Sequence, residues 1–98
     1  MPPYKLSKRA QAKLLDIYER SYEMFGEYQA DAYQAGFEKT FELLAMFPAI
    51  GRHADEIRPG FRRYRYQSHY IFYTLEADLI VIRNIIHTAR DLRPGLFD

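Results

Sequence analysis

The sequence predicts an α+β fold in which a hairpin of two antiparallel helices packs on a small, mostly antiparallel β-sheet. Between residues 8 and 47 the apolar side chains recur at intervals of three and four, the period of an amphipathic helix. After Gly60 the pattern changes to short extended runs rich in β-branched and aromatic residues. With 98 residues, 48% of them hydrophobic, the chain can build one core, so residues 1–98 are expected to form a single domain.

The first half of the chain carries the signals of one edge strand and two helices. Tyr4–Leu6 is a short extended run, and Ser7 is placed to cap a helix over residues 8–25. Gly26 should end that helix, because glycine adopts the left-handed backbone of a helix stop without strain. A second helix is expected from about residue 28 to residue 47, and so short a link makes the two helices antiparallel neighbours.

Pro48 ends the second helix, because a residue before proline is disfavoured in helical geometry, and residues 48–60 are expected to form a loop. Three extended runs follow, over residues 61–66, 69–76 and 79–86, and the two-residue links between them predict an antiparallel meander. The last run is almost continuously apolar, as in a central strand covered on both faces. The helical hairpin would cover one face, and the sequence leaves open whether a partner covers the other.

The side chains expected in the core share the helical stripes or the inner face of the strands. They are Leu14, Ile17, Phe37, Phe41, Leu44, Ile71, Tyr73, Ile80, Ile82 and Ile85. The hairpin holds more aromatic residues than one sheet face can bury, so some of its tyrosines are expected at a surface that a partner covers.

Composition excludes several classes of protein. The chain has no cysteine, which removes disulfides and thiol chemistry, and its three scattered histidines do not suggest a zinc site. It has no run of about 18 apolar residues and no apolar signal core at its N-terminus, so a soluble, cytoplasmic protein is expected. No phosphate-binding glycine loop, nucleophile motif or metal-binding carboxylate pair occurs. We therefore expect no catalytic residue, no metal and no cofactor.

The charges are distributed unevenly along the chain. The net charge of +1 argues against a general nucleic-acid binder, yet eight of the ten arginines follow Gly51 whereas all four lysines precede it. Arginine presents a planar fork suited to carboxylate or phosphate, so the second half is suited to directed anion contacts. The alternative is that acidic residues of the chain itself pair with these arginines. Those residues are Asp55, Glu56, Glu76, Asp78 and Asp91.

Four short sequence motifs in the second half, in a fixed order, connect the chain with a known family. They are Gly51-Arg52-His53, Glu56-Ile57-Arg58-Pro59-Gly60-Phe61-Arg62, His69-Tyr70-Ile71-Phe72-Tyr73 and Ile85-Ile86-His87-Thr88-Ala89-Arg90-Asp91. Behind two N-terminal helices, and over the range from Tyr4 to about Arg93, they make the chain resemble the ParE branch of the RelE/ParE toxin family. The resemblance implies the β-α-α-β-β-β order with a C-terminal tail that the periodicities also predict.

The ParE branch is described as the toxin component of type II toxin–antitoxin systems, which poisons DNA gyrase by binding. The resemblance therefore implies a toxin that needs a binding surface and no active site, neutralised by a ParD-like antitoxin with a DNA-binding ribbon-helix-helix domain. The toxin would reach nucleic acid only through that antitoxin. The residues expected to bind the antitoxin are Tyr18, Tyr22, Phe25, Tyr28, Tyr33, Arg58, Arg62 and Arg65. Those expected to bind the target are His87, Arg90, Arg93, Leu96 and Phe97.

Two other functions remain open on the sequence. The related RelE branch cuts messenger RNA on the ribosome, a reaction that needs a base and several cations. The residues that could supply them are Arg62, Arg65, His87 and Arg90. However, no tyrosine follows Tyr73, although much of the nuclease branch uses one in its tail, so His87 is expected at a strand end, bonded to backbone or to Asp91. The third possibility is a plain RNA-binding module, against which the longest basic run is only Arg62-Arg63.

Overall fold

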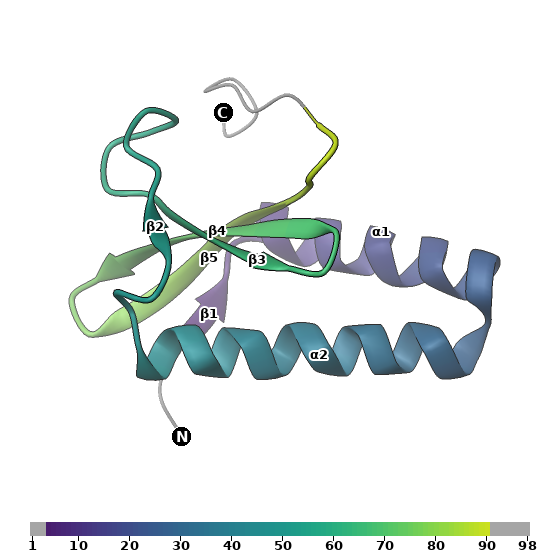
Figure 1. Cartoon of the computed structure of the whole chain (residues 1–98). Helices are drawn as coiled ribbons and strands as arrows, with labels where there is room; N and C mark the ends of the chain where they lie inside the picture. Colours follow the sequence, from purple (N-terminus) through teal and green to yellow (C-terminus); the bar gives the residue numbers. More distant parts are fainter. Residues whose placement is uncertain (1–3, 91–98) are drawn as a thin grey trace.

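The computed structural model describes residues 4–90, which form two helices and a five-stranded sheet (Figure 1). The elements in order are β1 (Tyr4–Leu6), α1 (Lys8–Phe25), α2 (Glu27–Met46), β2 (Arg52–His53), β3 (Arg62–Tyr66), β4 (His69–Glu76) and β5 (Leu79–His87). The predicted α+β class is confirmed, and the limits of the expected helices and strands differ by one residue at most. The short strand β2 is an addition, since the sequence predicted only a loop there.

The two helices form the expected hairpin on one side of the sheet (Figure 1). Ser7 caps α1, and its Oγ accepts a hydrogen bond of 3.1 Å from Ala10 N. Gly26 joins the helices with a φ of +88°, a backbone region that glycine enters at little cost. The predicted start and stop of α1 are therefore confirmed.

The strand order in the sheet is β1-β5-β4-β3-β2, so the last strand of the chain lies beside the first. β1 runs parallel to β5, whereas the other neighbouring pairs are antiparallel. The two hairpin turns place Gln67 and Ala77 at positive φ, as tight two-residue turns require. The predicted meander of three strands is thus confirmed, as is the predicted edge strand Tyr4–Leu6, whereas β2 at the other edge was not predicted.

The pairing of β4 with β5 contains an irregularity at Arg83. The ladder joins Phe72 to Asn84 and the next residue, Tyr73, to Ile82, which leaves Arg83 as an extra residue in β5. The Arg83 side chain lies against β4, with its Nε 3.0 Å from Thr74 Oγ1 and its terminal nitrogen paired to Glu76. Pairing of a strand arginine with an acid of the chain is therefore confirmed at this position.

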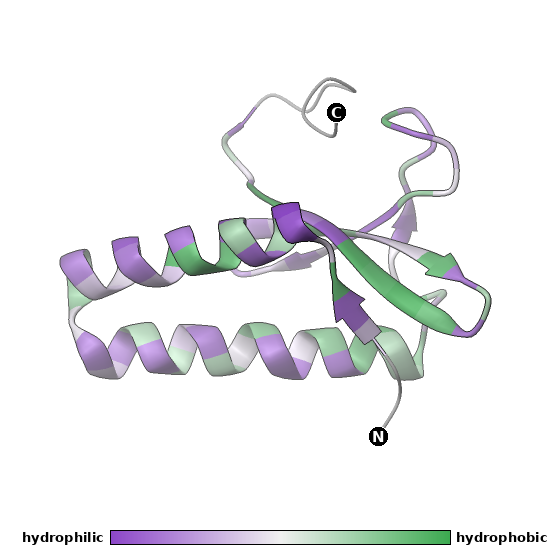
Figure 2. Cartoon of the chain, turned by 180° about the vertical axis from the view of Figure 1, so that it is seen from behind, coloured by the Kyte–Doolittle hydropathy of each residue, from purple (hydrophilic) through white to green (hydrophobic). Residues whose placement is uncertain are grey.

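The main core lies between the helical hairpin and the inner face of the sheet. Nine of the ten residues expected there are buried, and the tenth, Leu14, is half-buried and packs against them. Figure 2 shows the central strands coloured mainly as hydrophobic, whereas both helices alternate between hydrophilic and hydrophobic residues. This alternation is typical of amphipathic helices that cover one sheet face.

The outer face of the sheet, away from the helices, is partly covered by the chain itself. Phe72 and Ile86 are buried under Ala54, Ile57 and Phe61, which belong to the segment between β2 and β3. In Figure 1 this segment rises on the side of the sheet opposite α2. The chain itself therefore covers the second face of β5 at Ile86.

The helix α2 approaches the sheet closely at Gly36. A Cβ atom there would lie 1.7 Å from Tyr66 Oη, so only glycine leaves room for this ring. The Tyr66 ring packs on Tyr33 and Phe37, with centroid distances of 5.3 and 4.7 Å. This contact fixes the positions of Tyr33, Phe37 and Tyr66, next to the turn that joins β3 and β4.

Candidate functional site

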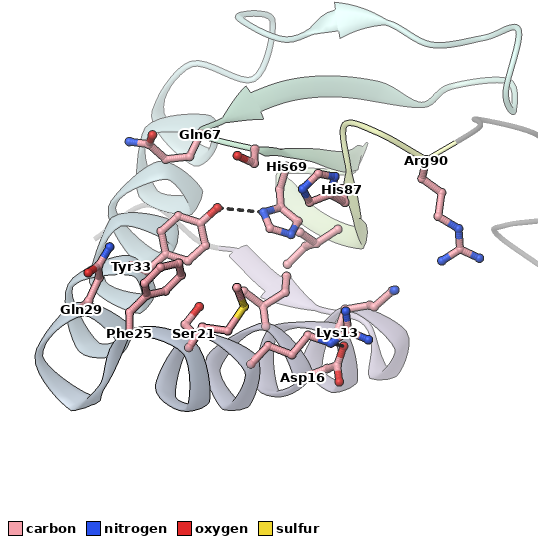
Figure 3. Close-up of a pocket in the computed structure, with 15 residues that line it drawn as sticks. Lys13, Asp16, Ser21, Phe25, Gln29, Tyr33, Gln67, His69, His87 and Arg90 are labelled. Carbon is pink, nitrogen blue, oxygen red and sulfur yellow. Dashed lines mark hydrogen bonds and ion pairs between the residues drawn. The ribbon is translucent and has the colours of Figure 1, made fainter.

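A groove of about 620 Å³ opens between α1, the start of α2, the β3–β4 turn and the end of β5 (Figure 3). Its apolar lining includes Ile17, Met24 and Phe25, of which Met24 and Phe25 are 71% and 57% exposed. Its cationic side chains include Lys13 and Arg90. The groove therefore joins exposed apolar surface to positive charge, a combination found at protein docking sites.

Tyr33 and His69 form a polar floor in this groove. Tyr33 Oη and His69 Nδ1 share a hydrogen bond of 2.8 Å (Figure 3). The His69 ring also meets Phe37 and His87 edge-on, with centroid distances of 5.8 and 5.2 Å. His69 and His87 come together because they are paired residues of β4 and β5, and paired residues project from the same side of a sheet.

His69 is neutral at physiological pH. Burial is the main cause, and the charges of His87 and Lys13 add to it, so the pKa of His69 falls from 6.5 to about 4. The positive charge of the groove at neutral pH therefore comes from its lysine and arginine side chains, Lys13 and Arg90 among them, rather than from His69.

His69 should make the protein less stable as the pH falls from about 6.5 to about 4. In that range the unfolded chain binds a proton at His69 that the folded chain does not, so the free energy of unfolding declines with pH. Urea unfolding near neutral pH and at about pH 4.5 should show a smaller loss for His69→Gln than for the wild type. His53→Gln is the control, because this histidine is exposed. If His69→Gln loses as much stability as the wild type, the burial of His69 is not as described.

The aromatic residues predicted to bind an antitoxin lie in three different settings. Phe25 and Tyr33 line the groove. Tyr22 and Tyr28 are 50% and 90% exposed on the hairpin. Tyr18 joins the two helices instead, since its Oη donates a hydrogen bond of 2.7 Å to a carboxylate of α2. Their contacts with an antitoxin stay predictions, and the hydroxyls of Tyr18 and Tyr33 are already engaged within the chain.

The three arginines of the same predicted set lie outside the groove. Arg62 Nη1 donates to Gly51 O at 2.7 Å and thereby ties the segment after α2 to β3. Arg65 Nε donates to Gln67 O at 2.8 Å. Arg58 is half-buried in the segment between β2 and β3. The structure therefore does not bring these guanidinium groups and the hairpin aromatics into one continuous surface.

Of the residues predicted to bind the target, His87 and Arg90 belong to the described part of the chain, and both line the groove. His87 is exposed, and its Nδ1 accepts a hydrogen bond of 3.0 Å from the backbone N–H two residues further on. The backbone contact expected of a strand-end histidine is confirmed. Arg93, Leu96 and Phe97 lie outside the described residues.

The side chains that a nuclease would need are separated. His87 faces the helical side of the sheet together with His69, whereas Arg65 faces the outer side. Arg62 lies at the far end of β3, about 13 Å along the strand from the residue paired with His69. Within residues 4–90, of the three candidate cations only Arg90 shares the groove with His87. The structure therefore does not assemble a base and several cations into one cleavage site.

Sequence reasoning missed several groove residues, among them Lys13, Met24 and His69. Lys13 precedes the buried Ile17 by four residues, so the two share a helix face. His69 precedes the buried Ile71 by two residues, so both project from one side of β4. Helical and strand periods could have placed these two, whereas nothing in the sequence distinguishes Met24.

Residues 4–90 contain neither a candidate metal site nor a membrane-spanning helix. No group of three histidine, aspartate or glutamate side chains in this range could hold a metal ion. In the same range neither helix is both long and apolar enough to cross a membrane.

The fold is shared with a solved toxin–antitoxin structure. A chain of the structure titled "Chromosomal ParDE TA system from P. aeruginosa" superposes with a TM-score of 0.75 and covers 89% of this chain and 96% of that one. At 19% sequence identity the likeness shows the fold alone. The chain thus has the same fold as that structure, a two-helix hairpin packed on a mostly antiparallel sheet.

Sequence comparison identifies the family. The family described as "ParE toxin of type II toxin-antitoxin system, parDE" matches residues 4–92. The chain is 35% identical over 96 residues to Toxin ParE1 of Caulobacter vibrioides, covering 98% of this chain and 99% of that protein. It is 38% identical over 95 residues to Toxin ParE1 of Mycobacterium tuberculosis, covering 95% and 96%. The chain belongs to the ParE family and is the toxin component of a type II toxin–antitoxin system.

Proposed function

We propose that the chain is a binding poison of DNA gyrase and that a ParD-like ribbon-helix-helix antitoxin neutralises it. Family membership supports both partners. The separation of His87 from Arg62 and Arg65 supports action by binding, because an inhibitor needs an exposed surface rather than a catalytic cluster. Gyrase and such an antitoxin both lie in the cytoplasm, so the proposal places the action of the toxin there.

The groove is the surface proposed for the antitoxin. Met24 and Phe25 offer exposed apolar anchors, and Lys13 and Arg90 offer positive charge beside them. An acidic amphipathic segment would fit this combination, because its apolar side would enter the groove and its carboxylates would meet the cations. Phe25 is the strongest anchor candidate, since aromatic side chains often carry much of the binding energy at an interface.

The contact with the target is proposed for the end of the chain. His87 and Arg90 precede residues 91–98, which include Arg93, Leu96 and Phe97. Two arginines followed by an apolar pair suit a protein surface better than a catalytic site. The alternative function, a ribosome-dependent mRNA endonuclease, would instead require His87 as its base.

Expression of the chain alone in bacteria should arrest growth, and co-expression of a ribbon-helix-helix protein from a neighbouring reading frame should restore it. His87→Ala should keep most of the growth arrest, because an interface loses one contact whereas loss of a general base costs about 10²–10⁴ in rate. Removing Leu96-Phe97-Asp98, or changing Arg90 and Arg93 together, should weaken the arrest more. Unaffected growth with the wild type, or arrest abolished by His87→Ala alone, would contradict the proposal.

A further inference from the structure

Three arginines and a tyrosine share the outer face of β2, β3 and β4, the side away from the helical hairpin. Arg52 pairs with Arg63, and Arg65 pairs with Tyr70. Directly opposed residues of antiparallel strands point to the same side of a sheet, and so do residues two apart in one strand. Arg52, Arg63, Arg65 and Tyr70 therefore project together, and we call this set the arginine face.

The arginine face has no acidic partner within the described chain. The Arg63 guanidinium lies over the Tyr70 ring, 5.1 Å from its centroid. Arg65 donates from Nε to a backbone carbonyl, and Arg52 is exposed. Between residues 4 and 90, none of these three guanidinium groups forms an ion pair with a carboxylate, in contrast to Arg83. The alternative, that acidic residues of the chain pair with the arginines, is therefore wrong for these three arginines over that range.

The spacing of the arginine face suits a row of phosphates. Arg63 and Arg65 lie about 6.6–6.8 Å apart along β3, and the adjacent strand lies about 4.8 Å away. One strand of a nucleic acid carries a charge about every 3.4 Å of helix axis, so three guanidinium groups can meet about two or three consecutive phosphates. The arginine fork donates two hydrogen bonds to one phosphate, and the Tyr70 ring already holds Arg63 in position.

The same face offers few anchors to a peptide. Its apolar residues Phe72 and Ile86 are 0% and 2% exposed, because the segment between β2 and β3 covers them. A peptide that adds to a sheet uses pockets for its alternate side chains, whereas a phosphodiester backbone needs only positive charge and donors. The exposed apolar anchors, Met24 and Phe25, lie on the helical side of the sheet.

We propose that the arginine face binds the phosphodiester backbone of a nucleic acid directly. This binding does not depend on gyrase being the target of the toxin. It departs from two expectations, that the net charge of +1 argues against a nucleic-acid binder and that, as the family resemblance implies, the toxin reaches nucleic acid only through its antitoxin. Net charge describes the whole chain, whereas contact with phosphates depends on the local cluster. With about three phosphate contacts, binding is weak, independent of base sequence and strongly dependent on salt.

The experiment measures binding of the full-length chain, without antitoxin, to fluorescent probes over a series of salt concentrations. The probes are a single-stranded DNA oligonucleotide, the RNA of the same sequence, the corresponding DNA duplex, and polyglutamate. Arg52→Ala/Arg63→Ala should weaken duplex binding at least about tenfold at low salt and reduce the salt slope by about two, because two phosphate contacts are lost. Arg20→Ala/Lys39→Ala removes the same charge from exposed helical positions and should leave the slope unchanged.

Arg65→Ala provides a second variant, expected to reduce the slope by about one, in case the double variant does not fold as judged by circular dichroism. Equal binding by the Arg52/Arg63 and Arg20/Lys39 variants would overturn the proposal. Tighter binding of polyglutamate than of any nucleic acid would also overturn it and assign the face to an acidic protein. A preference for RNA or for DNA would support the proposal in either case and identify the kind of strand.

Discussion

Replacing Phe41 with alanine should lower the free energy of unfolding by about 3–5 kcal/mol. Phe41 is 1% exposed and packs between α2 and the sheet, with Tyr4 and Phe37 at ring-centroid distances of 5.7 and 6.1 Å. Removing the ring leaves a cavity among close-packed neighbours that relax only in part. Urea unfolding followed by circular dichroism measures the difference.

Leu15→Ala is the matched control, because Leu15 is an apolar helical residue that is 59% exposed. We expect this change to stay within about 0.5 kcal/mol of the wild type. A loss for Phe41→Ala no larger than that for Leu15→Ala would mean that the hairpin does not pack on the sheet as described. The groove between the helical hairpin and the sheet would then be wrongly described as well.

Phe25→Asp should weaken protection by the antitoxin while leaving the growth arrest by the toxin in place. Phe25 is 57% exposed and lines the groove. The substitution removes an aromatic anchor and brings a negative charge to a surface proposed for an acidic segment. We expect a loss of about 2 kcal/mol or more in binding, roughly thirtyfold in affinity. Calorimetric titration with the purified antitoxin measures the affinity, and growth during co-expression measures the protection.

Phe47→Asp is a close control for this change. Phe47 is also a phenylalanine and is 55% exposed, but it caps the C-terminal end of α2 and is not among the residues that line the groove. The Phe47→Asp variant should bind the antitoxin like the wild type. If Phe47→Asp weakens binding and Phe25→Asp does not, the antitoxin docks at the opposite end of the hairpin.

Much of the fold could be predicted because its signals act over a few residues. Ser7 and Gly26 bound α1 through backbone chemistry that needs no distant contact. The strand β2 and the cover over the outer sheet face depend instead on contacts between distant segments. Ile57 and Phe61 are buried only because Phe72 of β4 lies beneath them, and local periodicity carries no information about that contact.

The candidate site was harder to predict because four elements contribute to it. Tyrosine is a residue type that is common at interfaces, but the position of Tyr33 on α2 directs its hydroxyl to His69. Arg62 has the chemistry of an anion-binding residue, yet its guanidinium bonds the backbone carbonyl of Gly51. Residue type indicates what a side chain can bind, whereas the element packed opposite decides what it does bind.

The claim that this toxin acts on gyrase by binding is tested most directly with purified components. The wild-type chain and His87→Ala are added to DNA gyrase with supercoiled DNA and, in parallel, to translating ribosomes with messenger RNA. We expect both proteins to cause accumulation of DNA cleaved by gyrase and to leave the messenger RNA intact. Ribosome-dependent RNA cleavage that disappears in His87→Ala, with gyrase unaffected, would contradict this claim and support the nuclease alternative.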